Sequence, residues 1–237
     1  MSQTFARLRS LCPTVSVGTL TADLMNLGAE LALLERSGVG IVHVDVMDGC
    51  FCPQLTVGPA YVKGLRTPLL KDVHLMIREP LDKLDAYAAA GADILTVHVE
   101  AAVHIHRVLQ RMGSLENANR PGEGIVRGLA FDPGTPLEWL EPLLDEVDMV
   151  TILAIDPGWS GQKFAPATLD RVTRIKEMVA AAGKEILICV DGGVTKDNIA
   201  GIVAAGADLV VTGSAVFDGR AAEANARFVL SAVTHAL

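Results

Sequence analysis

Short apolar runs alternate with longer amphipathic segments along almost the whole chain. Each run is rich in Val, Ile and Leu and is bounded by glycine or polar residues, which is typical of buried β-strands. Eight such runs are present, and they predict strands at 14–19, 41–46, 72–77, 94–99, 125–131, 149–155, 186–190 and 209–212.

The segments between the strands favour helices. Residues 22–36, 81–90 and 167–182 show the apolar spacing of an amphipathic helix. The phrase Ala-Gly-Ala-Asp, at 90–93 and again at 205–208, is expected to end a helix and open a strand, because glycine takes the left-handed cap conformation without steric cost. Eight strand–helix alternations predict a parallel α/β fold, the (β/α)8 TIM barrel, with a doubly wound open sheet as the competing architecture.

The domain organisation follows from the same pattern. A chain of 237 residues suits one TIM barrel, so we expect residues 1–237 to form a single domain. Residues 1–12 precede the first strand and are expected to be an N-terminal extension. Residues 113–124 (GSLENANRPGEG) are polar, rich in turn formers and without period, which predicts a surface loop inserted between the fourth helix and the fifth strand.

Composition and charge argue against some classes of binding partner. Aromatic residues make up only 4% of the chain, so the core must be aliphatic, as suits a parallel sheet buried on both faces. A net charge of -8 without a basic patch argues against nucleic acid. We find no apolar run of about 20 residues and no apolar core of a secretory signal near Arg7 and Arg9, so we expect no membrane partner and a cytoplasmic protein.

Two histidines and two aspartates lie where a barrel places its chemistry, at the carboxyl ends of strands. His43 and Asp45 end the second strand and share one face, because side chains alternate along a strand. His74 lies on the third strand and Asp191 ends the seventh. The four predict one divalent-cation site, for zinc, iron, manganese or cobalt. Taken alone, a histidine in an apolar strand such as His74 is more often a hydrogen-bonded core residue.

Other polar residues carry weaker signals. His98 and Glu100 form a similar H-x-E string after the fourth strand, but the pattern gives no reason to place them on the metal. Asp48 is expected to bond the backbone of the loop that it opens. His104 and His106 are interpreted as solvated helix residues. The four cysteines, Cys12, Cys50, Cys52 and Cys189, show no pairing pattern, and Cys50 and Cys52 are interpreted as packing residues.

Glycine-rich turns follow the last three predicted strands, at 157–162, 192–193 and 212–215. Glycine lets backbone N–H groups approach a ligand closely, and phosphate sites recur at the last strands of TIM barrels. A single turn of this kind is weak evidence, because any strand-to-helix turn needs small residues. Three at the same end of one barrel predict a site for a phosphorylated ligand.

Read in order, the strings HVDVMDG, DVHLM, PGWSGQKF, VDGG and GSAVF resemble the signatures of the ribulose-phosphate 3-epimerase family, from about Val15 to Phe217. The resemblance implies a barrel of the ribulose-phosphate-binding type and a metal-dependent isomerase that inverts C3 of a ketose phosphate through an ene-diolate. It also implies a homo-oligomer. D-ribulose 5-phosphate, converted to D-xylulose 5-phosphate, is the implied substrate, and another ketose phosphate such as allulose 6-phosphate is the alternative.

The resemblance also implies roles for individual residues. His43, Asp45, His74 and Asp191 match the metal ligands, and Asp45 and Asp191 match the acid/base pair. The positions that match substrate-binding residues are His74, two methionines beside the reacting carbons, and the phosphate and sugar loops: Met47, Met76, Gly158, Trp159, Ser160, Gly161, Gly192, Gly193, Gly213 and Ser214.

The chain departs from the family pattern around the sugar. Gly18 stands where a Ser is expected, Leu153 where a Met is expected, Gln54 in place of Asn and Trp159 in place of Phe. The reaction is therefore better supported than the identity of the sugar. A decarboxylase of the phosphate-binding barrels is disfavoured because no D-x-K-x-x-D string begins at Asp45. A non-catalytic sugar-phosphate-binding paralogue stays open, although such a protein has no need of four metal ligands.

Overall fold

Eight parallel strands pair around a closed ring, in the order β1-β10-β9-β8-β7-β4-β3-β2. The structure is a computed structural model that describes residues 2–159 and 161–235. The closed ring confirms the TIM barrel and excludes the open sheet. All eight predicted strands are present, as β1 Thr14–Gly18, β2 Ile41–Met47, β3 Leu70–Met76, β4 Ile94–His98, β7 Val126–Phe131, β8 Met149–Leu153, β9 Leu187–Asp191 and β10 Leu209–Thr212.

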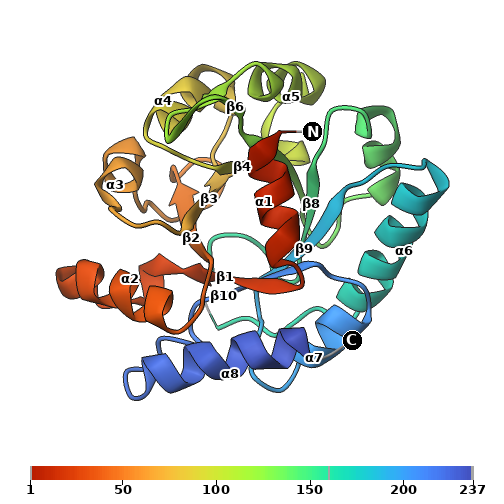
Figure 1. The fold of residues 1–237 in the computed structure, drawn as a ribbon. Helices are drawn as coiled ribbons and strands as arrows, with labels where there is room; N and C mark the ends of the chain where they lie inside the picture. The colour runs from red at the N-terminus through yellow and green to blue at the C-terminus, as the bar shows by residue number, and fades with distance from the viewer. Residues whose placement is uncertain (1, 160, 236–237) are drawn as a thin grey trace.

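Helices surround this ring (Figure 1). The α-helices after the first strand are α2 Leu27–Arg36, α3 Pro59–Gly64, α4 Leu84–Ala89, α5 Ile105–Gly113, α6 Thr168–Ala181, α7 Ile199–Ala204 and α8 Ala222–Thr234. Short 3₁₀ segments join them, at η1 Thr19–Thr21, η2 Leu24–Asn26, η3 Pro80–Lys83, η4 Val99–Ala101 and η5 Leu137–Leu143. None of the described helices is long and apolar enough to cross a membrane.

The strand residues divide into two apolar sets according to the face they occupy. Outward-facing residues such as Val42, Val44 and Val73 pack with the helices in the larger core. The residues that open the strands face inward and form a second core at the amino-terminal end of the barrel: Ile41, Leu70, Ile94, Val126, Met149, Leu187 and Leu209. An apolar floor therefore fills one end of the barrel, and the polar interior residues lie above it.

The N-terminal segment contributes to that floor. Residues 3–11 form helix α1 (Gln3–Leu11), which lies across the end of the barrel (Figure 1). Its side chains Phe5 and Leu8 are buried among the strand-opening residues. Ser2 caps the helix by accepting a hydrogen bond from the Phe5 N–H. The extension is thus a lid over the amino-terminal end of the barrel, and it leaves the carboxyl-terminal end for the site.

Residues 113–124 differ from the irregular loop that the sequence suggested. Gly113 ends α5 and the other residues lie between α5 and β7, but they contain an antiparallel hairpin of β5 (Glu116–Asn117) and β6 (Arg120–Gly124). Buried Asn117 donates to Asp93 at 2.8 Å, and Asn119 donates to the Gly91 carbonyl at 2.7 Å. These polar contacts hold the segment in place, which explains why it lacks the alternating apolar pattern of a strand.

We predict that Leu8→Ala lowers the free energy of unfolding by about 2–5 kcal/mol, because it leaves a cavity between α1 and the floor of the barrel. Gln3→Ala on the exposed face of the same helix is the control and should change it by less than about 0.5 kcal/mol. Urea unfolding of both variants measures the difference. Equal stability of the two would show that α1 does not seal the barrel.

Candidate metal centre and substrate pocket

The four residues predicted to hold a cation lie together at the carboxyl end of the barrel. His43 and Asp45 come from β2, His74 from β3 and Asp191 from the last position of β9. One donor atom from each lies within 4.8 Å of the other three. Strand register produces this, because Asp45 pairs with His74 across β2 and β3.

The spacing of the donor atoms suits one ion. Nε2 of His43 lies 3.1 Å from Oδ1 of Asp45 and 3.7 Å from Oδ2 of Asp191. Nδ1 of His74 lies 3.5 Å and 3.2 Å from the same two oxygens. Donors at about 2.0–2.2 Å from a tetrahedral ion are separated by about 3.3–3.6 Å, so the observed separations match a coordination shell. Two neutral imidazoles and two carboxylates also balance a divalent charge.

Nδ1 of His74 is also suited to bind a cation. The side chain is fully buried, yet among the described residues this nitrogen makes no hydrogen bond of acceptable geometry. A buried polar atom without a partner is costly, so its position facing two carboxylates calls for a positive group between them. The four residues therefore fit a divalent metal ion.

The electrostatics of the metal-free cluster point the same way. Burial opposes the charged form of His74, but Asp191 and Asp45 outweigh it and raise the pKa of His74 to about 9. Burial likewise opposes charge on His43, whose pKa is nevertheless raised by Asp72 and Asp45. Burial would raise the pKa of Asp45, but His43 and His74 hold it well below its usual range. The cluster thus attracts positive charge, from protons or from a metal ion.

His43 is oriented by a residue that the sequence analysis did not single out. Its Nδ1 lies 2.8 Å from Oδ2 of the buried Asp72, which also accepts a hydrogen bond from the Ser16 hydroxyl at 2.9 Å. A metal-binding histidine commonly donates its second N–H to a carboxylate, which fixes the ring and its tautomer. The sequence could have revealed Asp72 through strand alternation, because it lies two positions before His74 and so shares its face of β3.

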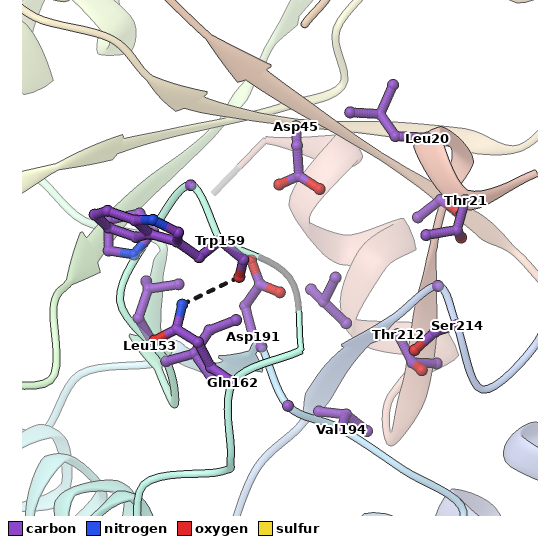
Figure 2. Close-up of a pocket in the computed structure, with 18 of the residues that line it drawn as sticks. Leu20, Thr21, Asp45, Leu153, Trp159, Gln162, Asp191, Val194, Thr212 and Ser214 are labelled. Atoms are coloured by element: carbon purple, nitrogen blue, oxygen red, sulfur yellow. Dashed lines mark hydrogen bonds between the residues drawn. The ribbon is translucent and has the colours of Figure 1, made fainter. Parts of the chain in front are cut away.

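Above the cluster lies a pocket of about 630 Å³. Its walls include Asp45 and Asp191, whose carboxyl groups point into the same space in Figure 2. Nine of the predicted substrate-binding residues line it: Met47, Met76, Gly158, Trp159, Gly161, Gly192, Gly193, Gly213 and Ser214. Ser160 lies outside the described residues, and His74 lies beneath the pocket rather than in its lining.

The pocket also contains residues that sequence reasoning did not select. Leu20, Thr21, Thr56 and Gln162 contribute to the lining. Gln162 closes the turn after β8, because its amide donates to the carbonyl of Asp156 at 2.7 Å and to that of Trp159 at 3.1 Å, the second of which is drawn in Figure 2. Such side chains sit on irregular turns, where no periodic pattern marks them. The substituted positions Gly18, Gln54, Leu153 and Trp159 all face this pocket.

Position 158 favours glycine for two reasons, its backbone conformation and the lack of space for a side chain. Its φ is 92°, and an added Cβ would come within 2.7 Å of the Cβ of Cys52. Cys52 is buried as expected of a packing residue, whereas Cys50 is exposed, so the packing interpretation is wrong for Cys50. Asp48 accepts the N–H groups of Cys50 and Phe51, each at 2.8 Å, which confirms its expected role in the loop.

The remaining histidines fall into two groups. His104 and His106 are exposed, as expected. His98 is fully buried and lies beside the metal cluster: its Nε2 is 2.8 Å from Nε2 of His74. On its other side lie Glu100 and Asp132, and these three form a second group with metal-ligand spacing. The sequence pattern had not connected His98 with the site.

Comparison with known proteins agrees with this geometry. Residues 14–217 match the model of the ribulose-phosphate 3 epimerase family. Ribulose-phosphate 3-epimerase of Bacillus subtilis (strain 168) is 41% identical over 206 residues, covering 86% of this chain and 91% of that protein. The chloroplastic ribulose-5-phosphate-3-epimerase of Arabidopsis thaliana is 40% identical over 210 residues, covering 87% and 72%.

Solved structures are similar in fold at much lower identity. The 3-hexulose-6-phosphate synthase of Salmonella typhimurium matches with a TM-score of 0.69 at 15% identity, covering 94% of this chain and 100% of that one. Thiamine phosphate pyrophosphorylase of Pyrococcus furiosus matches with a TM-score of 0.63 at 15% identity, covering 97% and 99%. These likenesses show the fold alone.

We predict that the metal-free protein loses stability as pH rises. The pKa of His74 is about 9 in the folded chain against an ordinary 6.5, so its contribution is full below 6.5 and is lost as pH rises through about 9. The loss should be on the order of 1–3 kcal/mol. Urea unfolding of chelator-treated protein at both ends of this range measures it. His74→Gln should show a smaller loss, and an unchanged loss would contradict the assignment.

Proposed function

Since this chain belongs to the ribulose-phosphate 3-epimerase family, and is therefore an isomerase, we propose that it inverts C3 of a ketose phosphate, with D-ribulose 5-phosphate and D-xylulose 5-phosphate as the pair of substrates. The observation that carries the proposal is the convergence of His43, Asp45, His74 and Asp191 at the base of the pocket. A paralogue that only binds sugar phosphates has no need of this set.

The chemistry requires a proton to leave a carbon next to a ketone and return on the other face. A carboxylate alone is too weak a base for this step, and a divalent ion held by the four residues would supply the positive charge that stabilises the ene-diolate. Asp45 suits the role of a base because its carboxylate is partly exposed in the lining of the pocket, beside the other proposed ligands.

Inversion needs a second acid/base group on the opposite side of the substrate. Asp45 and Asp191 lie on β2 and β9, which are separated in the ring by β1 and β10. Their side chains are 27% and 13% exposed, so both reach the pocket. In the proposed mechanism one aspartate removes the C3 proton, and the other donates a proton to the opposite face.

The upper part of the pocket suits the phosphate group. Its wall there consists of the turns at Gly192-Gly193 and Gly213-Ser214. These turns lie outside the helices and strands. Among the described residues, the N–H groups of Gly193 and Ser214 donate to no backbone carbonyl there. Free N–H groups on adjacent turns can bind phosphate oxygens, and an overall negative chain needs only such local donors.

The sugar-facing walls support a proposal about specificity. Met47 and Met76 are neighbours across β2 and β3 and contribute an apolar surface, to which Leu153 adds. Gly18 offers no hydroxyl where the family pattern has Ser. These two substitutions favour a second candidate, a related ketose phosphate such as allulose 6-phosphate as the preferred substrate. A homo-oligomer stays a prediction.

We predict that Asp191→Asn lowers kcat/KM for D-ribulose 5-phosphate by about 10²–10⁴, because it removes one of two acid/base groups at nearly constant volume. The exposed Asp197, outside the pocket lining, provides the control Asp197→Asn, which should retain wild-type activity. A coupled assay for D-xylulose 5-phosphate, at saturating Co²⁺, measures both. Near-wild-type activity in Asp191→Asn would mean that this carboxylate does not move the proton.

A further prediction concerns Gly18. An added Cβ there would lie 3.5 Å from the Cα of Gly213, an ordinary contact, so a serine fits without displacing the backbone. The new hydroxyl can satisfy a substrate polar group, which is worth about 1–3 kcal/mol, or about 5- to 150-fold in kcat/KM. We therefore expect Gly18→Ser to raise kcat/KM for D-ribulose 5-phosphate, or the wild type to prefer another ketose phosphate. A wild type that already prefers D-ribulose 5-phosphate and gains nothing from Ser would refute the role of this position.

A further inference from the structure

His98 contacts His74, one of the four residues proposed to bind the metal. The Nε2 atoms of His98 and His74 are 2.8 Å apart, while the ring centroids are 4.8 Å apart and the rings are inclined by 10°. The rings are nearly parallel, and the two nitrogens are close enough for a hydrogen bond, so one N–H donates to the other nitrogen. Both rings are fully buried, and Phe51 packs against His98 with centroids 4.7 Å apart.

The far side of His98 faces two carboxylates. Its Nδ1 is 3.0 Å from Oδ1 of Asp132, which follows β7, and 3.4 Å from Oε2 of Glu100 in η4. Glu100 is held through its other oxygen, which accepts the N–H of Asp132 at 2.9 Å and the Thr135 hydroxyl. Among the described residues, neither the two oxygens that face His98 nor Nδ1 of His98 has a hydrogen-bond partner of good geometry. Both oxygens therefore face Nδ1 of His98, which can carry either a proton or a bound cation.

This arrangement permits either a second cation or a hydrogen-bonded relay, and proton positions decide between them. Each neutral imidazole carries one proton. If Nδ1 of His74 uses its lone pair to bind the metal, its proton is on Nε2 and is donated to Nε2 of His98. The proton of His98 must then lie on Nδ1, facing Asp132 and Glu100, and this nitrogen cannot bind a cation.

The opposite assignment disables the first site. A cation on Nδ1 of His98 places the proton of His98 on Nε2, directed at His74. The proton of His74 is then forced onto Nδ1, toward Asp45 and Asp191, and blocks a metal there. Two neutral histidines cannot serve two ions across this contact. The first cluster offers four donors and the second three, so the first is favoured.

We propose that His98, whose Nδ1 faces Glu100 and Asp132, is a positioning residue for His74, one of the four proposed metal ligands. It accepts the Nε2 proton of His74 and so holds the Nδ1 lone pair of that residue toward the metal site. The inference rests on the proposed metal centre. The two histidines differ in what orients them. His43 bonds directly to the carboxylate of Asp72, whereas His74 bonds to the imidazole of His98, which in turn faces Asp132 and Glu100. Such outer partners are commonly worth 10- to 100-fold in metal affinity.

The test is Co²⁺ binding to the metal-depleted full-length chain, followed by the visible absorption of Co²⁺ and by the number of ions bound. His98→Leu removes the acceptor and should weaken binding by about 10- to 100-fold. His98→Gln supplies an amide oxygen that can accept the proton of His74 and an NH₂ group for the carboxylates, so we expect affinity within about threefold of the wild type. Rescue by Gln is not expected of a residue that only fills space.

A double-mutant cycle separates the relay from general damage. Asp132→Asn in the wild-type background should weaken Co²⁺ binding several-fold, and the same change in His98→Leu should have no further effect, because the two residues act in series. Binding by the wild type tests the metal centre itself, whereas the ratios between variants test only the role of His98. Unchanged affinity in His98→Leu overturns the proposal. So do two Co²⁺ ions per wild-type chain with one lost in Asp132→Asn.

Discussion

The structure depends on the placement of two carboxylates and two imidazoles around one point inside a barrel. Asp45 and Asp191 lie close to the same two histidine nitrogens, an arrangement that is favourable only with positive charge between them. The strand register, the apolar floor under α1 and the buried bonds of Asp72 and His98 all serve to hold these donors in place. Such preorganisation is what a metal site needs from its scaffold.

The sequence predicted what depends on periodicity. Apolar runs located eight strands, and alternation along β2 put His43 and Asp45 on one face. It did not predict contacts between side chains from different strands, such as His98 with His74 or Asp132, because no pattern within one strand encodes them. The hairpin within 113–124 was missed for another reason: Asn117 and Asn119 hold it through polar bonds, without apolar alternation.

The residues proposed for the chemistry and those that depart from the family pattern line the same pocket. The proposed metal-ligand and acid/base residues match the family pattern, whereas Gly18, Leu153 and Trp159, which line the same pocket, depart from it. A barrel can therefore change its substrate while its reaction is retained. The similar folds of a hexulose-phosphate synthase and a pyrophosphorylase, at 15% identity, illustrate that the scaffold alone does not determine the reaction.

The central claim is that Asp45 and Asp191 each serve one face of the substrate. The most direct measurement is solvent deuterium exchange at C3 of each epimer separately, in D₂O at saturating Co²⁺, with Asp45→Asn and Asp191→Asn. A single remaining carboxylate can remove and return a proton on its own face without inversion. The account predicts that each variant exchanges C3 of only one epimer and that the two variants select opposite epimers. Exchange of the same epimer by both variants, or of both epimers by either, would contradict it.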